Sequence, residues 1–388
     1  MTPVYLHHLG IVNALGSDPE SVRRNLYAGS TAGMREREDL VPGRRVRVGE
    51  ALTALPPIAA DLKAYASRNN RLLQQAVDQI RPAIDAALSR YGAKRVGTVL
   101  GTSTAGIAEG EHALATRLKS GAFPAEFDYR QQEIGSPSEY LRQALGLGGP
   151  AWTVSTACTS SAKALSSAKR LLDTGLCDAM IVGGVDSLCR LTLNGFAALE
   201  SVSHGLCNPM SRNRDGINIG EGAALFLMSR EPGPVAVLGI GESSDAYHIS
   251  GPDPEGRGAE IALRQALAGA DAGAVDYLNL HGTATSQNDQ MESHVVRRVL
   301  GEVACSSTKP LVGHTLGAAG ATELAFCWML LTEPGAATLP PHVWDGEVDP
   351  ALAPLNLVGT GMTRECRLVA SNSFAFGGNN ICVLLGRG

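Results

Sequence analysis

The 388-residue sequence lacks several patterns that would assign a protein to a common class. Its 33 basic and 38 acidic residues give a net charge of −5, so no basic excess favours a nucleic-acid partner. No 18 apolar residues run uninterrupted, and no basic segment precedes an apolar stretch at the start, so we expect neither membrane insertion nor a secretory signal. The absence of a G-x-S-x-G segment disfavours a serine hydrolase.

Cysteine is present, but not in patterns that would form a metal site or a disulfide framework. No C-x-x-C pair occurs, and no cysteine and histidine spacing is typical of zinc. We therefore expect no bound metal, unpaired thiols and a reducing cytoplasm. The cysteines are Cys158, Cys177, Cys189, Cys207, Cys305, Cys327, Cys366 and Cys382.

Short apolar runs alternate with longer amphipathic segments, which indicates an α/β protein with helix-covered sheets. The expected strands span residues 95–100, 179–182, 223–228, 235–240, 277–280 and 381–385. The expected helices span residues 68–90, 162–172, 259–267, 289–300 and 318–331. Residues 30–62 are rich in arginine with little periodicity, which favours a surface excursion.

Three pairs of segments suggest that the chain contains two similar halves. Residues 101–106 resemble 281–285, each directly after an expected strand. The segment around Cys158 resembles 313–321, each opening a helix of small residues, and 220–227 resembles 376–383, each a glycine-rich turn that leads into a strand. The halves would meet near 230–234, giving residues 1–234 and 235–388. In such a duplicated fold the helix starts of both halves converge, which would bring Cys158 and His314 together.

Cys158 is the candidate nucleophile. It lies between an apolar run and a helix of small residues, in Val154-Ser-Thr-Ala-Cys-Thr-Ser-Ser-Ala162. The first N–H groups of a helix are unpaired and its dipole is positive at that end, so this position favours the thiolate, which is the nucleophilic form.

Two histidines of the second half supply what a thiol nucleophile needs. His281 follows the strand at 277–280, at a strand end where catalytic groups are commonly held. His314 lies at a predicted helix start, which disfavours the protonated imidazole. A neutral imidazole there can hydrogen-bond a substrate oxygen and stabilise a developing enolate.

Together these segments resemble a known family. Val154–Ala162, His281–Asp289, Ser307–Lys309, Val312–Glu323 and Asn372–Asn380 are similar to the signature segments of the elongating β-ketoacyl-[acyl-carrier-protein] synthases, in the family's order. Two further segments, Arg214–Gly222 and Ser243–His248, also match. The resemblance covers nearly the whole chain, from about Gly10 to the C-terminus.

The resemblance implies a thiolase-like fold of two duplicated halves in five layers, α-β-α-β-α, and a decarboxylative Claisen condensation. Cys158 would take an acyl group from an acyl carrier protein, and malonyl carrier protein would then lose CO₂ and attack that thioester. No cofactor is implied, since phosphopantetheine arrives on the carrier protein. The family usually forms homodimers, while a heterodimer with a related synthase-like subunit is the alternative.

The resemblance also implies roles for single residues. His281 and His314 would hold the malonyl carbonyl, with Lys309 and Glu323 supporting them. The backbone N–H groups of Cys158 and Phe376 would form the oxyanion hole, with the Phe376 loop as a gate. Thr283, Thr285 and Phe374 would contact substrate, and Lys63, Arg68 and Arg71 would meet the acidic carrier protein.

The residues also discriminate among relatives. A thiolase would need a second catalytic cysteine, and the candidate for that role is Cys382, which lies near the end of the sequence. Priming synthases have asparagine where this chain has His314, and non-catalytic partner subunits lack the nucleophilic cysteine. Ala284 and Ala375 replace glycines that are usual in the family, which favours a specialised synthase, such as one building polyene chains, over bulk fatty acid synthesis.

Overall fold

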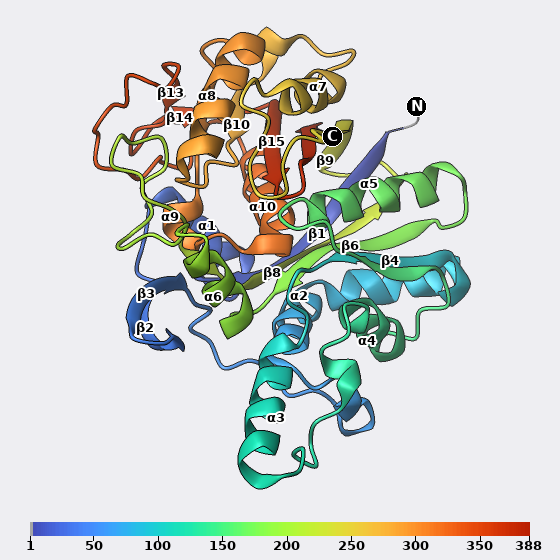
Figure 1. The fold of residues 1–388 in the computed structure, drawn as a ribbon. Coiled ribbons are helices and arrows are strands. Elements are labelled where there is room, and N and C mark those ends of the chain that lie inside the picture. The colour runs from blue at the N-terminus through green and yellow to red at the C-terminus, as the bar shows by residue number, and fades with distance from the viewer. Residues whose placement is uncertain (1–2) are drawn as a thin grey trace.

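The computed structural model describes residues 3–388, whose main sheet has eleven strands in two similar groups (Figure 1). The first group runs in the order β5 (Ala151–Val154), β4 (Val96–Gly101), β6 (Ala179–Asp186), β8 (Gly222–Ser229) and β1 (Val4–Asn13). The second runs in the order β11 (Ala304–Ser306), β10 (Tyr277–Asn279), β15 (Leu368–Ala375), β16 (Asn379–Arg387) and β9 (Val235–Ser244), with β13 (Asn356–Leu357) added beside β11. In both groups the first three strands are parallel and the last two pair antiparallel.

The helices form layers on and between the two groups of strands. Figure 1 shows α7 and α8 at the top, α2 and α4 toward the bottom, and α5 and α10 between them. The two central helices contact each other and strands of both groups. This is the expected α-β-α-β-α layering, with the two sheets joined at one edge where β1 pairs with β9. The bounds are α2 (Arg68–Tyr91), α4 (Ser136–Ala144), α5 (Ser160–Asp173), α7 (Arg257–Ala266), α8 (Ser286–Leu300) and α10 (Ala319–Thr332).

The layer that a helix occupies follows from its sequence. Helix α2 lies on the outside and buries one face only, through residues such as Leu72, Val77 and Ile84, while its other face is polar. The Ser67 side chain caps its first turn by accepting from the Asn70 N–H. Helix α10 is apolar on nearly all sides and lies in the central layer, where both of its faces meet strands.

The three sequence echoes fall at equivalent places in the two groups. Residues 101–106 follow β4 as residues 281–285 follow β10, and Cys158 follows β5 as His314 follows β11. The glycine-rich segments precede β8 and β16. The apolar cluster around α5 and α10 includes residues from strands of both groups, and the division at 234/235 stays a prediction.

Residues 30–62 differ from the expectation of an irregular excursion. Strands β2 (Met34–Val41) and β3 (Arg44–Gly49) form a hairpin that pairs with β7 (Ile219–Gly220). Its arginines bind carboxylates of the same hairpin, as Arg45 binds Glu36 and Glu38. Because so many of its side chains are charged, the hairpin could not be recognised from apolar periodicity. The other elements are α1 (Pro19–Tyr27), α3 (Ile107–Ser120), α6 (Arg190–Ala198), α9 (Lys309–Val312), β12 (Ala337–Thr338), β14 (Thr363–Arg364) and the 3₁₀ turns η1 (Ala60–Tyr65), η2 (Ala93–Arg95), η3 (Tyr129–Gln131), η4 (Ala272–Ala274) and η5 (Leu316–Ala318).

Candidate active site

Cys158 lies in the short turn between β5 and α5, two residues before the helix begins. The preceding Ala157 has φ 52°, in the left-handed region that residues with a side chain seldom adopt. The Ser160 hydroxyl holds this turn, since it accepts from the Thr156 N–H at 2.9 Å and donates to the Ala157 carbonyl at 2.6 Å. Strained turns of this kind are concentrated at functional sites.

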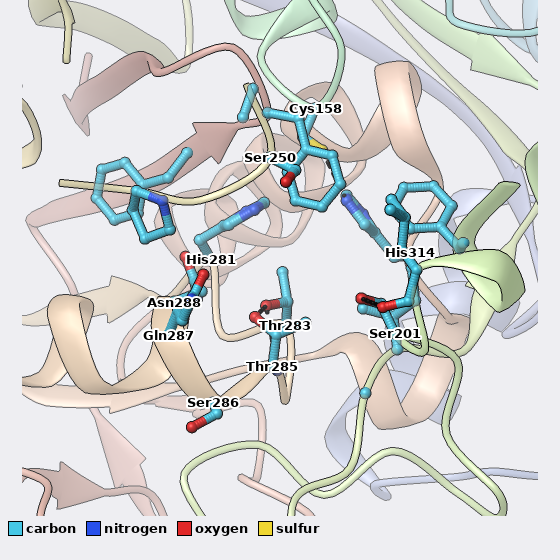
Figure 2. Close-up of a pocket in the computed structure, with 18 of the residues that line it drawn as sticks. Cys158, Ser201, Ser250, His281, Thr283, Thr285, Ser286, Gln287, Asn288 and His314 are labelled. Atoms are coloured by element: carbon cyan, nitrogen blue, oxygen red, sulfur yellow. Dashed lines mark hydrogen bonds between the residues drawn. The ribbon is translucent and has the colours of Figure 1, made fainter. Parts of the chain in front are cut away.

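The structure brings both candidate histidines to this cysteine. The Nε2 atom of His314 lies 3.0 Å from the Cys158 sulfur, although 156 positions separate them. The rings of His281 and His314 lie edge to face, with their centroids 5.4 Å apart. Figure 2 shows the two imidazoles pointing toward the sulfur from either side. The predicted convergence of the two halves is therefore present.

The resting protonation of the site differs from the sequence expectation for Cys158. Burial raises the pKa of this thiol to about 12, although the Lys309 charge and the backbone N–H groups of Cys158 and Phe376 act in the opposite direction. The expectation that the helix start favours a thiolate is thus wrong for the resting protein. Desolvation outweighs the helix end, and the thiol must give up its proton during the reaction.

The two imidazoles are neutral. Burial, with the charge of Lys309 as the next cause, holds the pKa of both His281 and His314 well below the ordinary value. His314 was expected at a helix start, but it lies in the turn between α9 and η5, ahead of α10. Its neutrality comes from burial beside a cation, and Nε2 can accept the thiol proton from Cys158.

Lys309 and Glu323 form a buried ion pair beside the histidines. The Lys309 Nζ lies 2.5 Å from a Glu323 carboxylate oxygen, and both side chains are at most 3% exposed. The same ammonium donates to the backbone carbonyl of His281. Lys309 therefore fixes the loop that carries His281, while Glu323 compensates its charge.

Two backbone N–H groups are directed at the Cys158 sulfur: its own and that of Phe376. Phe376 lies in the turn between β15 and β16, and its ring packs against Phe196 with the centroids 5.5 Å apart. The Gly377 N–H donates to the Ile249 carbonyl at 2.8 Å, which ties this turn to a neighbouring loop. The pair of donors can stabilise an oxyanion on a carbonyl bonded to the sulfur.

A cavity of about 420 Å³ opens onto the sulfur and both imidazoles. Thr283, Thr285 and Phe374 all line it, as the sequence predicts, and the two threonine hydroxyls are 2.9 Å apart. The Phe374 ring meets the His281 ring edge to face, with the centroids 5.9 Å apart. The cavity thus combines an apolar wall with hydroxyl groups that suit an amide-containing arm.

The two alanines that replace the family's glycines behave differently. Ala284 is fully buried with φ 65°, so it carries the strain that a glycine would avoid. Ala375 ends β15 in a paired strand position opposite Asn379 and has no positive φ. The substitution is therefore strained in the loop after His281 and unstrained beside Phe376.

Two of the three proposed docking residues bind groups of the same chain. The Arg68 guanidinium binds the buried carboxylate of Glu221, and Arg71 donates to the carbonyls of Leu55 and Pro56. Lys63 alone of the three is exposed. Both arginines therefore have structural contacts, and carrier-protein docking by the three residues stays a prediction.

Sequence reasoning missed two carboxylates that hold the His281 loop. Glu292 accepts from the backbone N–H groups of His281 and Gly282 at 2.8 and 2.7 Å. Asp289 accepts from the N–H of Ala284 at 3.2 Å. Both are buried on α8, three residues apart, and burial raises the pKa of Glu292 to about 7. Their spacing on one helix face directly after the His281 segment was the available signal.

Comparison with known proteins places this geometry in a family. The β-ketoacyl synthase N-terminal domain matches residues 3–232, and the β-ketoacyl synthase C-terminal domain matches residues 235–343. The chain belongs to the β-ketoacyl synthase family. It is thus an acyltransferase-type condensing enzyme of the elongating kind, with the thiolase-like α/β fold of ketosynthases.

Full-length relatives support this assignment. Nodulation protein E of Rhizobium meliloti strain 1021 is 31% identical, with 97% of each chain covered. The 3-oxoacyl-[acyl-carrier-protein] synthase 2 of Coxiella burnetii is 30% identical, with 99% of this ketosynthase and 98% of that protein covered. A solved ketosynthase in complex with its chain length factor, from Xenorhabdus doucetiae, includes a chain of 45% identity and TM-score 0.96, covering 100% of this chain and 98% of that one.

None of the helices within residues 3–388 combines the length and apolar character needed to cross a lipid bilayer.

Proposed function

We propose that this ketosynthase elongates an acyl chain bound to Cys158 by decarboxylative condensation with malonyl carrier protein. The observation that carries the proposal is the contact of 3.0 Å between the Cys158 sulfur and a neutral His314, with His281 beside it in the same cavity. A second catalytic cysteine, which a thiolase would need, is not offered by Cys382, because that residue is buried in β16 and does not line the cavity that holds Cys158.

The acyl transfer begins with the neutral thiol. His314 accepts its proton as the sulfur attacks the carbonyl of the incoming acyl thioester, and the N–H groups of Cys158 and Phe376 stabilise the oxyanion. The carbon–sulfur bond to the carrier arm then breaks, and the arm leaves as a thiol with the proton. No cofactor belongs to the protein in this scheme, because phosphopantetheine comes with the carrier protein.

The condensation uses both imidazoles. The malonyl thioester loses CO₂, and the electron pair of the broken bond forms an enolate. Its oxygen accepts hydrogen bonds from His281 and from His314, whose neutral ring carries its proton on Nε2 in this step. The enolate carbon attacks the Cys158 thioester, the new carbon–carbon bond forms as the carbon–sulfur bond breaks, and the released thiolate regains a proton from water. Thr283 and Thr285 hold the arm in this step, while Lys309 and Glu323 keep His281 in place.

The experiment separates the two half-reactions. With acyl carrier protein and malonyl carrier protein, the native enzyme should release CO₂ and form a 3-oxoacyl product. His281→Ala should retain acylation of Cys158 but lose most of the decarboxylation, roughly 10²-fold or more for a lost transition-state donor. Cys158→Ser should capture no acyl group. Equal loss of both half-reactions in His281→Ala would contradict the assigned roles.

We also propose that the enzyme works in the cytoplasm as a heterodimer with a chain-length-factor-like subunit. Strand β5 is an open edge of the sheet and exposes Trp152, and helix α3 also exposes large apolar side chains, Leu114 and Leu118. The complex of the Xenorhabdus doucetiae relative favours this partner over a second identical copy. The enzyme expressed alone should aggregate or be inactive, whereas an active homodimer would support the alternative.

A further inference from the structure

The thiol and the two imidazoles also form a set of metal-ligating groups. Each residue offers one ligand atom, and these atoms of Cys158, His281 and His314 all lie within 4.8 Å of one another. Within residues 3–388 no other group of three such side chains is brought together in this way. All three residues are at most 7% exposed, so they are largely shielded from bulk solvent at the end of the cavity.

One sulfur and two ring nitrogens are ligands that suit Zn²⁺. Zinc binds thiolate at about 2.3 Å and imidazole nitrogen at about 2.0–2.1 Å in tetrahedral geometry. Ligand atoms of such a site are therefore several ångströms apart, within the spread that the three residues already show. The set holds one sulfur and two imidazole nitrogens, so a hard ion such as Mg²⁺ would find no oxygen ligand among the three.

The surroundings allow a fourth ligand and limit the affinity. The cavity of about 420 Å³ borders all three residues, so water can complete the tetrahedron. The charge of Lys309 would repel a dication, but Glu323 lies 2.5 Å from that ammonium and offsets it. The Nδ1 atoms of His281 and His314 have no hydrogen-bond partner, whereas ligands of tight sites donate from that nitrogen. These features favour reversible binding over a permanent structural metal.

We propose that Cys158, His281 and His314 form a zinc site that reversibly inhibits the condensing centre. The inference rests on the proposed function, because the metal would cap the nucleophile of that reaction. Zn²⁺ replaces the proton of the Cys158 thiol, a sulfur–zinc bond forms, and the proton leaves to water. An acylated sulfur has no free thiolate to offer, so the metal and the acyl group exclude each other.

The test uses Co²⁺ as a spectroscopic probe of the full-length enzyme. One equivalent should produce a sulfur-to-cobalt charge-transfer band, which Zn²⁺ should abolish by displacement. Cys158→Ser should lose the band, and His281→Ala or His314→Ala should weaken cobalt binding roughly tenfold or more. His204→Ala is the matched control, because that imidazole is 83% exposed and outside the site, and it should bind as the native enzyme does.

Activity supplies a second readout. Zn²⁺ should inhibit the native enzyme and a chelator should restore the rate, while enzyme acylated beforehand should show no cobalt band. A band that persists in Cys158→Ser, or the absence of any band from a folded native enzyme, would overturn the zinc site. If the band appears but no acyl group is ever captured on Cys158, the proposed function fails while the metal site stands.

Discussion

Replacement of Lys309 by methionine tests how much the buried Lys309–Glu323 ion pair contributes to the stability of the protein. The substitution leaves Glu323, whose side chain is 3% exposed, without a cation. The carboxyl can escape the cost of a buried charge by taking up a proton. From the ordinary carboxyl pKa of about 4.3 to pH 7, at 1.36 kcal/mol for each unit, that protonation costs about 3.7 kcal/mol. Loss of the donor to the His281 carbonyl adds about 1–3 kcal/mol.

We therefore expect Lys309→Met to lower the free energy of unfolding by about 5–7 kcal/mol at pH 7. Urea denaturation followed by circular dichroism and tryptophan fluorescence measures this change. The matched variant Lys309→Met/Glu323→Gln removes the charge problem and should lose only about 1–3 kcal/mol. Additive effects of the two substitutions, or a single-variant loss below about 1 kcal/mol, would refute the reasoning.

The same reasoning gives the pH dependence of the single variant. In Lys309→Met the folded protein binds a proton on Glu323 that the unfolded chain has released above its ordinary pKa. Because the folded state then holds more protons, stability falls as pH rises. The penalty should shrink by about 2.7 kcal/mol between pH 7 and pH 5. A penalty that does not change with pH would show that Glu323 stays charged or reaches water.

Two further substitutions test the loops around the histidines. Ala284→Gly should raise the free energy of unfolding by about 0.5–1 kcal/mol. A φ of 65° strains alanine by more than the extra entropy that glycine gains in the unfolded chain. The midpoint of urea unfolding measures this change. His342→Ala should slow decarboxylation more than acylation of Cys158. The buried His342 accepts from the Ser307 N–H at 3.0 Å and donates to the Pro209 carbonyl at 2.9 Å, so it holds the loop that leads to Lys309. Equal slowing of both half-reactions would show that His342 has only a general structural role.

Much of the fold could be predicted because its elements have strong apolar patterns. The five expected helices begin and end within a few residues of the observed bounds, as α5 at Ser160–Asp173 and α10 at Ala319–Thr332 show, whereas α4 was not predicted. The β2–β3 hairpin was not predicted in this way, since β2 consists mainly of paired charges and β3 offers only the short alternation of Val46 and Val48 with arginines. Its stability depends on partners that are distant in sequence, such as β7.

The active site could also be predicted only in part. Cys158 and His281 lie in motifs that follow strands, and His314 lies in the turn after α9, so the equivalent positions in the two similar groups bring them together. Their protonation could not be read from the sequence, because burial of Cys158 outweighs the local helix end. The contact between Arg68 and Glu221 could not be predicted either, because the two residues are 153 positions apart in the sequence.

Peptide mapping of the acylated enzyme by mass spectrometry tests the central claim most directly. After incubation with acyl carrier protein thioesters of different chain lengths, the account predicts one acyl group on Cys158 and none on the other seven cysteines. The Cys158→Ser variant should stay unmodified under the same conditions. An acyl group found on another cysteine, or retained by Cys158→Ser, would contradict the account.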